Sequence, residues 1–146
     1  MERDKLIREL TTAARQRLER YNMLVKLADE QRSILIGSRH SELADNLASF
    51  DPLLIEIKRI EKQEDTLLRH MVEAGGDDPG PEYRVLKGRI AESADLLHRI
   101  SVTNKQLLTR QMEYVSFSLG MMVKIATEHS IIGPGNNAAL MLDSKV

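Results

Sequence analysis

The sequence predicts an all-α protein, an elongated antiparallel three-helix bundle or coiled coil with a longer third helix and a flexible C-terminal tail. Charged residues make up 29% of the 146 residues and aromatic residues only 3%, a mixture typical of long helices and coiled coils. Apolar residues recur in steps of three and four along most of the chain. Two glycine-bearing stretches, Gly37-Ser38 and 75–81, divide the chain into three segments.

The first segment predicts a helix from about Glu2 to Ile36. Its apolar residues follow steps of three, four and seven, which return to one face of a helix. They are Ile7, Leu10, Ala14, Leu18, Tyr21, Val25, Ala28 and Leu35. Gly37 suits a left-handed C-terminal cap of this helix, and Ser38 suits the N-cap of the next one.

The second segment predicts a helix from about Arg39 to Ala74. A heptad pattern opens it, formed by Leu43, Leu47, Phe50, Leu54 and Ile57. Proline lacks an amide donor and clashes with the preceding turn, so Pro52 predicts a kink or a restart of the helix. A restart would have Asp51 as the cap and Pro52 in the first helical position.

The next two positions of this heptad pattern are occupied by glutamates, Glu61 and Glu64. The stripe is therefore either exposed to solvent at this point or shifted locally towards Ile60 and Leu67. We interpret the two glutamates as part of a charged, solvent-facing helix surface rather than as acid–base groups.

The third segment predicts a helix from about Pro81 to Thr127. Its face is marked by Leu86, Ile90, Leu97, Ile100, Asn104, Leu108, Met112, Val115, Leu119 and Met122. Asn104 lies in phase with these apolar residues, where it either sets the register or lies at the rim. The sequence after His129 contains Gly-Pro-Gly-Asn-Asn and loses the helical pattern. We expect a helical bundle over residues 1–128 and a flexible tail over 129–146.

The end of the third helix is low in charge. Between Gln111 and Thr127 the only charged residues are Glu113 and Lys124, and three of the seven methionines lie there. At ~1.5 Å per residue, a helix of about 47 residues exceeds neighbours of about 35, so we expect it to extend past them from near Val115. An apolar face there is either ordinary core or is covered by the tail, a second copy or a client protein.

Several classes of function are disfavoured by the composition. The net charge, 21 − 22 = −1, provides no basic field for nucleic acid or anionic membrane. No cysteine is present, and no Glu-x-x-His or His-x-x-x-His pair suggests a metal site. Phosphate-loop and nucleophile-elbow motifs are also absent. We therefore expect no catalytic residue, no metal, no cofactor and no enzymatic activity. The longest apolar uncharged run, 114–123, is too short to span a membrane, so we expect a cytoplasmic protein.

Several segments of the chain follow one another in a characteristic order. A charged first helix closes at Ile36-Gly37, and a second opens on SRHSELADNL. IKRIEKQ precedes the loop, and the long third helix contains Asn104-Lys-Gln-Leu-Leu108 before Met112. This layout resembles the FlgN family of flagellar export chaperones. Ile132-Gly133 stands where family tails often carry Tyr-Gly, so the chain departs from the pattern there.

The resemblance implies a cytoplasmic, non-enzymatic chaperone that binds the C-terminal helical segments of hook-associated proteins, which form the hook–filament junction. It would prevent their premature assembly and deliver them to the flagellar type III export apparatus. Within the family, clients bind the end of the long helix and the tail. The corresponding residues here are Leu107, Leu108, Met112, Val115, Leu119, Met122, Ile125, Ile131 and Ile132. The alternative is a structural coiled-coil scaffold, a homo-oligomer that dimerises through the same apolar end.

Overall fold

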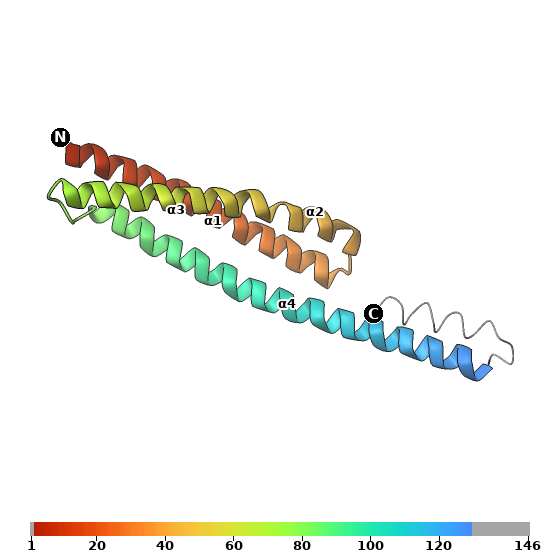
Figure 1. Cartoon of the computed structure of the whole chain (residues 1–146). Coiled ribbons are helices and arrows are strands. Elements are labelled where there is room, and N and C mark those ends of the chain that lie inside the picture. The colour runs from red at the N-terminus through yellow and green to blue at the C-terminus, as the bar shows by residue number, and fades with distance from the viewer. Residues whose placement is uncertain (1, 130–146) are drawn as a thin grey trace. The chain divides into compact units, whose positions relative to one another are not determined.

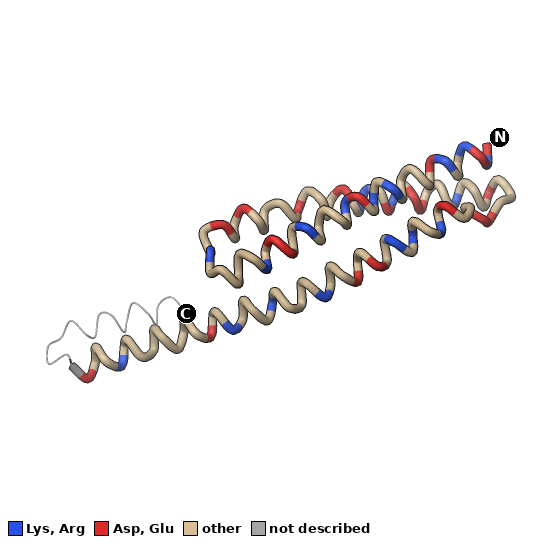
Figure 2. Tube along the Cα trace, turned by 180° about the vertical axis from the view of Figure 1, so that it is seen from behind, with Lys and Arg blue, Asp and Glu red and all other residues tan. Residues whose placement is uncertain are grey.

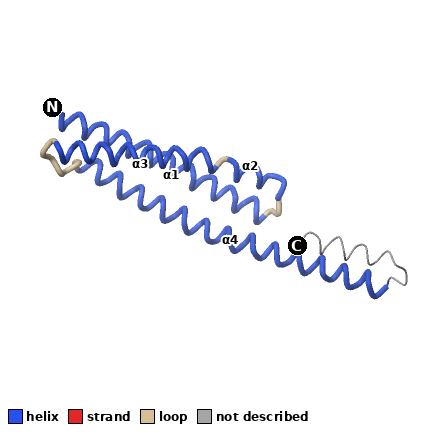
Figure 3. Tube along the Cα trace, in the orientation of Figure 1, coloured by secondary structure: helices blue, strands red, loops and turns tan. Residues whose placement is uncertain are grey.

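The computed structural model describes residues 2–129, and all regular structure within them is helical. The elements are α1 (Glu2–Ile36), a short 3-10 helix η1 (His40–Glu42), α2 (Leu43–Ala48), α3 (Phe50–Glu73) and α4 (Pro81–His129). Figure 3 shows short turns between the helices and no strand in this range. The all-α prediction is confirmed, and α1 and α4 match the predicted helices closely. The predicted tail lies outside the described residues, except that His129 is the last residue of α4.

The chain divides into two compact units, Met1–Lys105 and Gln106–Val146, with the boundary inside α4. In the first unit, α1 and α3 lie side by side and antiparallel, while the first part of α4 runs parallel to α1 (Figure 1). In the pairs that join α1 to α2 and α3, the residue number falls along α1 as it increases along the partner helix, as antiparallel packing requires: Leu27–Asn46, Arg20–Glu56 and Arg17–Glu64. In the pairs that join α1 to α4, the residue numbers increase together, as parallel packing requires: Arg15–Glu82, Asn22–Ser93 and Ala28–Asn104. The first unit is therefore an up–down–up bundle.

The end of α1 differs from the predicted cap by one residue. Ser38, not Gly37, adopts the left-handed conformation, with φ of 53°. The amide of Ser38 donates to the Leu35 carbonyl, and the amide of Arg39 donates to the Ile34 carbonyl, the two bonds of a Schellman motif. Ser38 is thus a C-terminal cap residue, and its assignment as an N-cap is wrong.

The second predicted helix is interrupted at Ser49, so that α2 and α3 are separate elements. Pro52 is the third residue of α3 and has no amide hydrogen to donate to the carbonyl of Ala48, the last residue of α2. The restart is confirmed, but its position is not: Ser49 precedes the helix instead of Asp51. The missing hydrogen bond explains why the break lies before the proline rather than at it.

The core of the first unit is made by one face each of α1, α3 and α4. It contains Leu6, Leu10, Ala14, Leu67, Met71, Tyr83, Leu86 and Ile90. Ile60 and Leu67 of α3 are buried. The alternative in which the apolar stripe shifts towards these two residues is therefore confirmed. Residues of α1 outside the predicted stripe are buried as well, because this helix contacts both α3 and α4. They include Leu6, Ala13, Leu24 and Ile34. Sequence periodicity followed only one of these two faces.

Glu64 is buried, so its interpretation as a solvent-facing residue is wrong. Its exposed fraction is 2%, and its carboxylate lies 2.6 Å from Nε of Arg17 on α1. The hydroxyl of Tyr83 on α4 donates to the same carboxylate at 3.1 Å. Burial raises the pKa of Glu64 above its usual value, and Arg17 and Tyr83 only partly offset this. Burial and the adjacent carboxylate raise the pKa of Tyr83 to about 12.

Asn104 is buried rather than at the rim. Its side-chain amide donates to the carbonyl of Ala28 at 2.8 Å and to the side-chain oxygen of Gln31 at 2.9 Å. These two bonds fix the axial register of α4 relative to α1. A buried polar residue bonded in this way favours one register over alternatives that would leave it unpaired.

We expect Ser38→Gly to stabilise the protein by about 0.5–1 kcal/mol, because glycine adopts positive φ without the steric cost that serine meets. Urea unfolding followed by circular dichroism measures the change. The matched control is Ser33→Gly, an exposed position inside α1 where glycine should instead destabilise by about 0.5 kcal/mol. Equal effects at the two positions would contradict the assignment of the cap.

We expect Tyr83→Phe to destabilise the protein by about 1–2 kcal/mol at neutral pH, because the ionised Glu64 loses a hydrogen bond. The pKa of Glu64 in the folded protein lies above its ordinary value of 4.5. The contribution of Glu64 to stability is therefore fully present below pH 4.5 and is lost as the pH rises through the raised pKa. The variant raises this pKa further, so its destabilisation should shrink as the pH falls towards 4.5. Exposed Tyr114 supplies the control, since Tyr114→Phe should leave the unfolding curve unchanged at every pH.

Candidate functional site

The second unit contains the helical stretch 106–129, in which charge becomes sparse. Figure 2 shows closely spaced charged residues along α1, α3 and the first part of α4, and few towards the described end of α4. Arg110, Glu113, Lys124 and Glu128 are the charged residues of the stretch 106–128, and their formal charges sum to zero. The remaining surface is mostly apolar. Interactions of this surface with another molecule would therefore be governed by apolar contact rather than by electrostatic attraction.

The apolar side chains of this stretch are exposed to solvent. Most of the predicted site residues belong to the exposed set, which comprises Met112, Val115, Leu119, Met122 and Ile125. Leu107 and Leu108 are half-buried. Ile131 and Ile132 lie outside the described residues. The structure thus shows five of the nine candidates as an accessible apolar surface within one helix.

Sequence reasoning missed three further exposed apolar residues of the same helix. They are Tyr114, Phe117 and Met121, and Tyr114 and Phe117 are exposed by 71% and 67%. Large aromatic side chains are the residues most often found at the centre of protein interfaces. The predicted face is a single line of apolar residues; Tyr114 and Met121 lie on the next line around the helix, and Phe117 lies on neither. A count of every large apolar residue around the helix would have found them.

The local sequence explains why this surface is helical. Leucine, methionine, glutamine and lysine have high helix propensity, and Gly120 is the only glycine of the stretch. The Thr127 hydroxyl donates to the Val123 carbonyl within the helix. Helix propensity and backbone hydrogen bonds thus maintain a structure whose apolar side chains have no cover among the described residues of the second unit.

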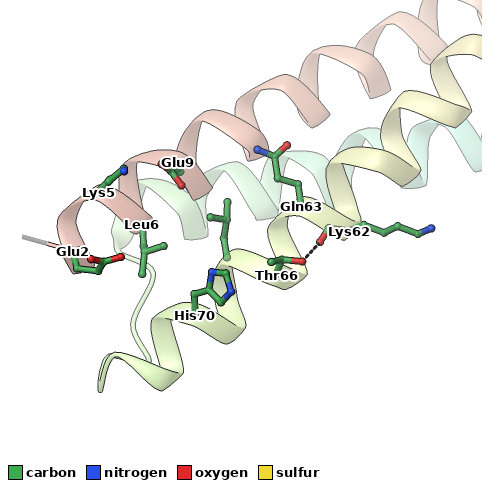
Figure 4. A pocket seen from close by; sticks show the side chains of 9 residues that line it. Glu2, Lys5, Leu6, Glu9, Lys62, Gln63, Thr66 and His70 are labelled. Carbon is green, nitrogen blue, oxygen red and sulfur yellow. Dashed lines mark hydrogen bonds between the residues drawn. The ribbon is translucent and has the colours of Figure 1, made fainter.

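A separate hollow lies in the first unit between the start of α1 and the second half of α3 (Figure 4). Its volume is about 480 Å³, and Leu6 and Leu67 contribute apolar surface to it. Its other lining residues are polar or charged: Glu2, Lys5, Glu9, Lys62, Gln63, Thr66 and His70. The Thr66 hydroxyl donates to the carbonyl of Lys62 within α3. Because charges of both signs surround it, this hollow selects no ligand chemistry as clearly as the apolar surface of α4 does.

No group of three or more His, Asp and Glu side chains within residues 2–129 is placed to hold a metal ion. In the same range, no helix has both the length and the apolar character needed to cross a bilayer. Comparisons of the chain with models of known families, with curated proteins and with solved structures found no match.

Methionine oxidation should report this surface directly. We expect hydrogen peroxide to oxidise Met112 and Met122 faster than Met71 by more than about ten-fold, because Met71 reacts only after unfolding. The exposed fractions are 62% and 66% for the first two and 1% for Met71. Peptide mapping by mass spectrometry measures each rate. In urea the three rates should become equal, and equal rates in the folded protein would contradict the exposure described.

Proposed function

We propose that this protein is a non-enzymatic helical chaperone that holds an amphipathic helical segment of a partner protein on the second-unit part of α4. The observation that carries the proposal is the exposure of eight large apolar side chains between residues 112 and 125. Only two charged residues lie among them. Solvent-exposed apolar surface of this extent marks an interaction site in soluble proteins.

The composition of this surface favours a protein partner. A helix laid along an apolar helical face is a common mode of peptide recognition, and its contacts recur every three or four residues. Met112, Met121 and Met122 supply unbranched, polarisable side chains that repack around partners of different shape. Tyr114 and Phe117 supply rigid contact area at low entropic cost.

The resemblance to the FlgN family narrows the proposal. On that basis the partners are hook-associated proteins, the segments bound are their C-terminal helices, and the complex is delivered to the flagellar export apparatus from the cytoplasm. Binding would keep these segments from assembling before export. Ordering of the partner segment costs entropy, which favours moderate affinity and release without a nucleotide.

The test is light scattering after gel filtration, with the intact protein alone and mixed with the C-terminal helical segment of a hook-associated protein. We expect a 1:1 complex. Replacing Met112, Leu119 and Met122 together by Gln should weaken binding by at least about 100-fold, since three apolar contacts are lost. Circular dichroism should show an unchanged fold, because all three side chains are exposed.

The matched control is the triple change Ile55→Gln, Val72→Gln and Val85→Gln, which alters exposed apolar residues of the first unit. It should leave the complex intact. No complex with the hook-associated segment would overturn the family-based proposal. A constitutive homodimer that the variant of α4 dissociates would support the structural scaffold instead, because the same exposed side chains would then form a seam between two copies.

A further inference from the structure

The exposed apolar residues of 106–128 lie mainly on two parallel lines, not one, with Phe117 beside the second of them. The first seam is Leu108, Met112, Val115, Leu119, Met122 and Ala126. The second seam is Leu107, Gln111, Tyr114, Ser118, Met121 and Ile125. Each seam repeats in steps of four and three, the pattern of a helix–helix contact. Each residue of the second seam directly precedes one of the first, so the seams are about 100° apart around the helix.

Together the two seams occupy roughly 180° of the helix circumference, at about 100° per residue. The opposite side carries a polar strip of Thr109, Glu113, Ser116, Gly120, Lys124 and Thr127, with the apolar residues Val123 and Phe117 at its two edges. The large apolar residues of both seams from Met112 onwards are exposed. A two-stranded helix contact uses a narrower strip of about two residues in seven. One helix laid on this surface therefore covers one seam and leaves the other in water.

The first half of α4 shows how the two lines differ. There the line that leads to the second seam in steps of three and four is occupied by Tyr83, Leu86, Ile90, Ser93, Leu97, Ile100 and Asn104, and all of these are buried or half-buried. The line that leads to the first seam carries Arg84, Lys87, Ala91, Ala94, His98, Ser101 and Lys105. Most of these residues are exposed. The first seam is thus apolar only in the second unit, because the same line of residues is mostly polar in the part of α4 that packs within the bundle.

The apolar run after His129 is shorter than either seam, and a two-fold dimer matches only one seam on each copy. The longest apolar run after His129 is the five residues 138–142, which span at most about 17 Å at ~3.3 Å per residue. Each seam spans 19 residues, or roughly 28 Å of helix. A two-fold dimer uses the same seam on both copies and leaves the other seam of each copy exposed. The methionines also specify a fixed self-contact poorly.

We propose that the partner held by α4 presents two neighbouring helices, one against each seam, so that the complex forms a local three-helix assembly. This inference rests on the proposed function and adds the shape of the partner. Each partner helix carries a heptad stripe of apolar residues. The four charges of residues 106–128 cancel, so affinity should depend little on salt.

The test uses the absence of cysteine in this chain, which makes an introduced cysteine a unique labelling site. An environment-sensitive fluorophore is attached to Met122→Cys in the first seam, Met121→Cys in the second, or Ser116→Cys in the polar strip. The probe is an unassembled, full-length hook-associated protein. We expect its addition to shift the emission to the blue at positions 121 and 122 and to leave position 116 unchanged.

A blue shift at only one of positions 121 and 122 would overturn the two-helix inference and leave the proposed function standing. No shift at any position, with no complex by light scattering, would overturn the proposed function and the inference with it. A shift that grows with the concentration of the labelled protein alone would assign the seams to further copies of this chain. A blue-shifted emission before addition of the probe, abolished by deletion of residues 130–146, would assign a seam to the chain's own C-terminal segment.

Affinity measurements provide a second readout on the full chain. The first-seam pair Leu119→Gln with Met122→Gln and the second-seam pair Met121→Gln with Ile125→Gln should each weaken binding of the same probe by about 10–100-fold. Ser116→Gln in the polar strip should change it by less than about two-fold. Sensitivity confined to one pair would show that a single helix is bound. Glutamine maintains helix propensity, so circular dichroism should be unchanged in all three variants.

Discussion

The buried carboxylate of Glu64 joins all three helices of the first unit. It lies on α3, contacts Arg17 of α1 and accepts a hydrogen bond from Tyr83 of α4. Removing a carboxylate from water is costly, and this arrangement is tolerated because the charge is paired and hydrogen-bonded. Slippage of α1 by a turn would separate the charge from Arg17, and slippage of α4 would remove the hydrogen bond from Tyr83. This contact therefore favours one register of the three helices.

Asn104 provides a second constraint of the same kind near the end of the first unit. Its bonds to the Ala28 carbonyl and to Gln31 fix α4 against α1 shortly before the surface that we assign to partner binding. Along α4 the residues thus change from an apolar line buried within the bundle, through a polar register point, to apolar seams without cover in the described chain. Asn104 thus sets the register of the first-unit part of α4 directly before the boundary between the two units.

Most of the fold follows from residue spacing. The helical periods, the glycines near 37 and 75 and the proline at 52 predicted three helical segments, and the bounds of α1 and α4 agree closely with the structure. The errors concern residues whose role depends on neighbours distant in sequence. Glu64 belongs to a charged run, and nothing within that run indicates that Arg17 and Tyr83 lie beside it. Ser38 rather than Gly37 adopts the left-handed conformation after α1, although α1 ends at Ile36 as predicted.

The candidate surface was predicted in part for the same physical reason. Low charge and apolar spacing are local properties, so the sequence by itself determined that residues 107–125 form an apolar helical stretch. Whether those side chains are core or surface depends on what packs against them, and only the tertiary structure decided that those from Met112 onwards are exposed. It also added Tyr114, Phe117 and Met121 to the surface. Periodicity reports the face that a helix can bury, whereas burial itself requires a neighbouring helix within contact distance.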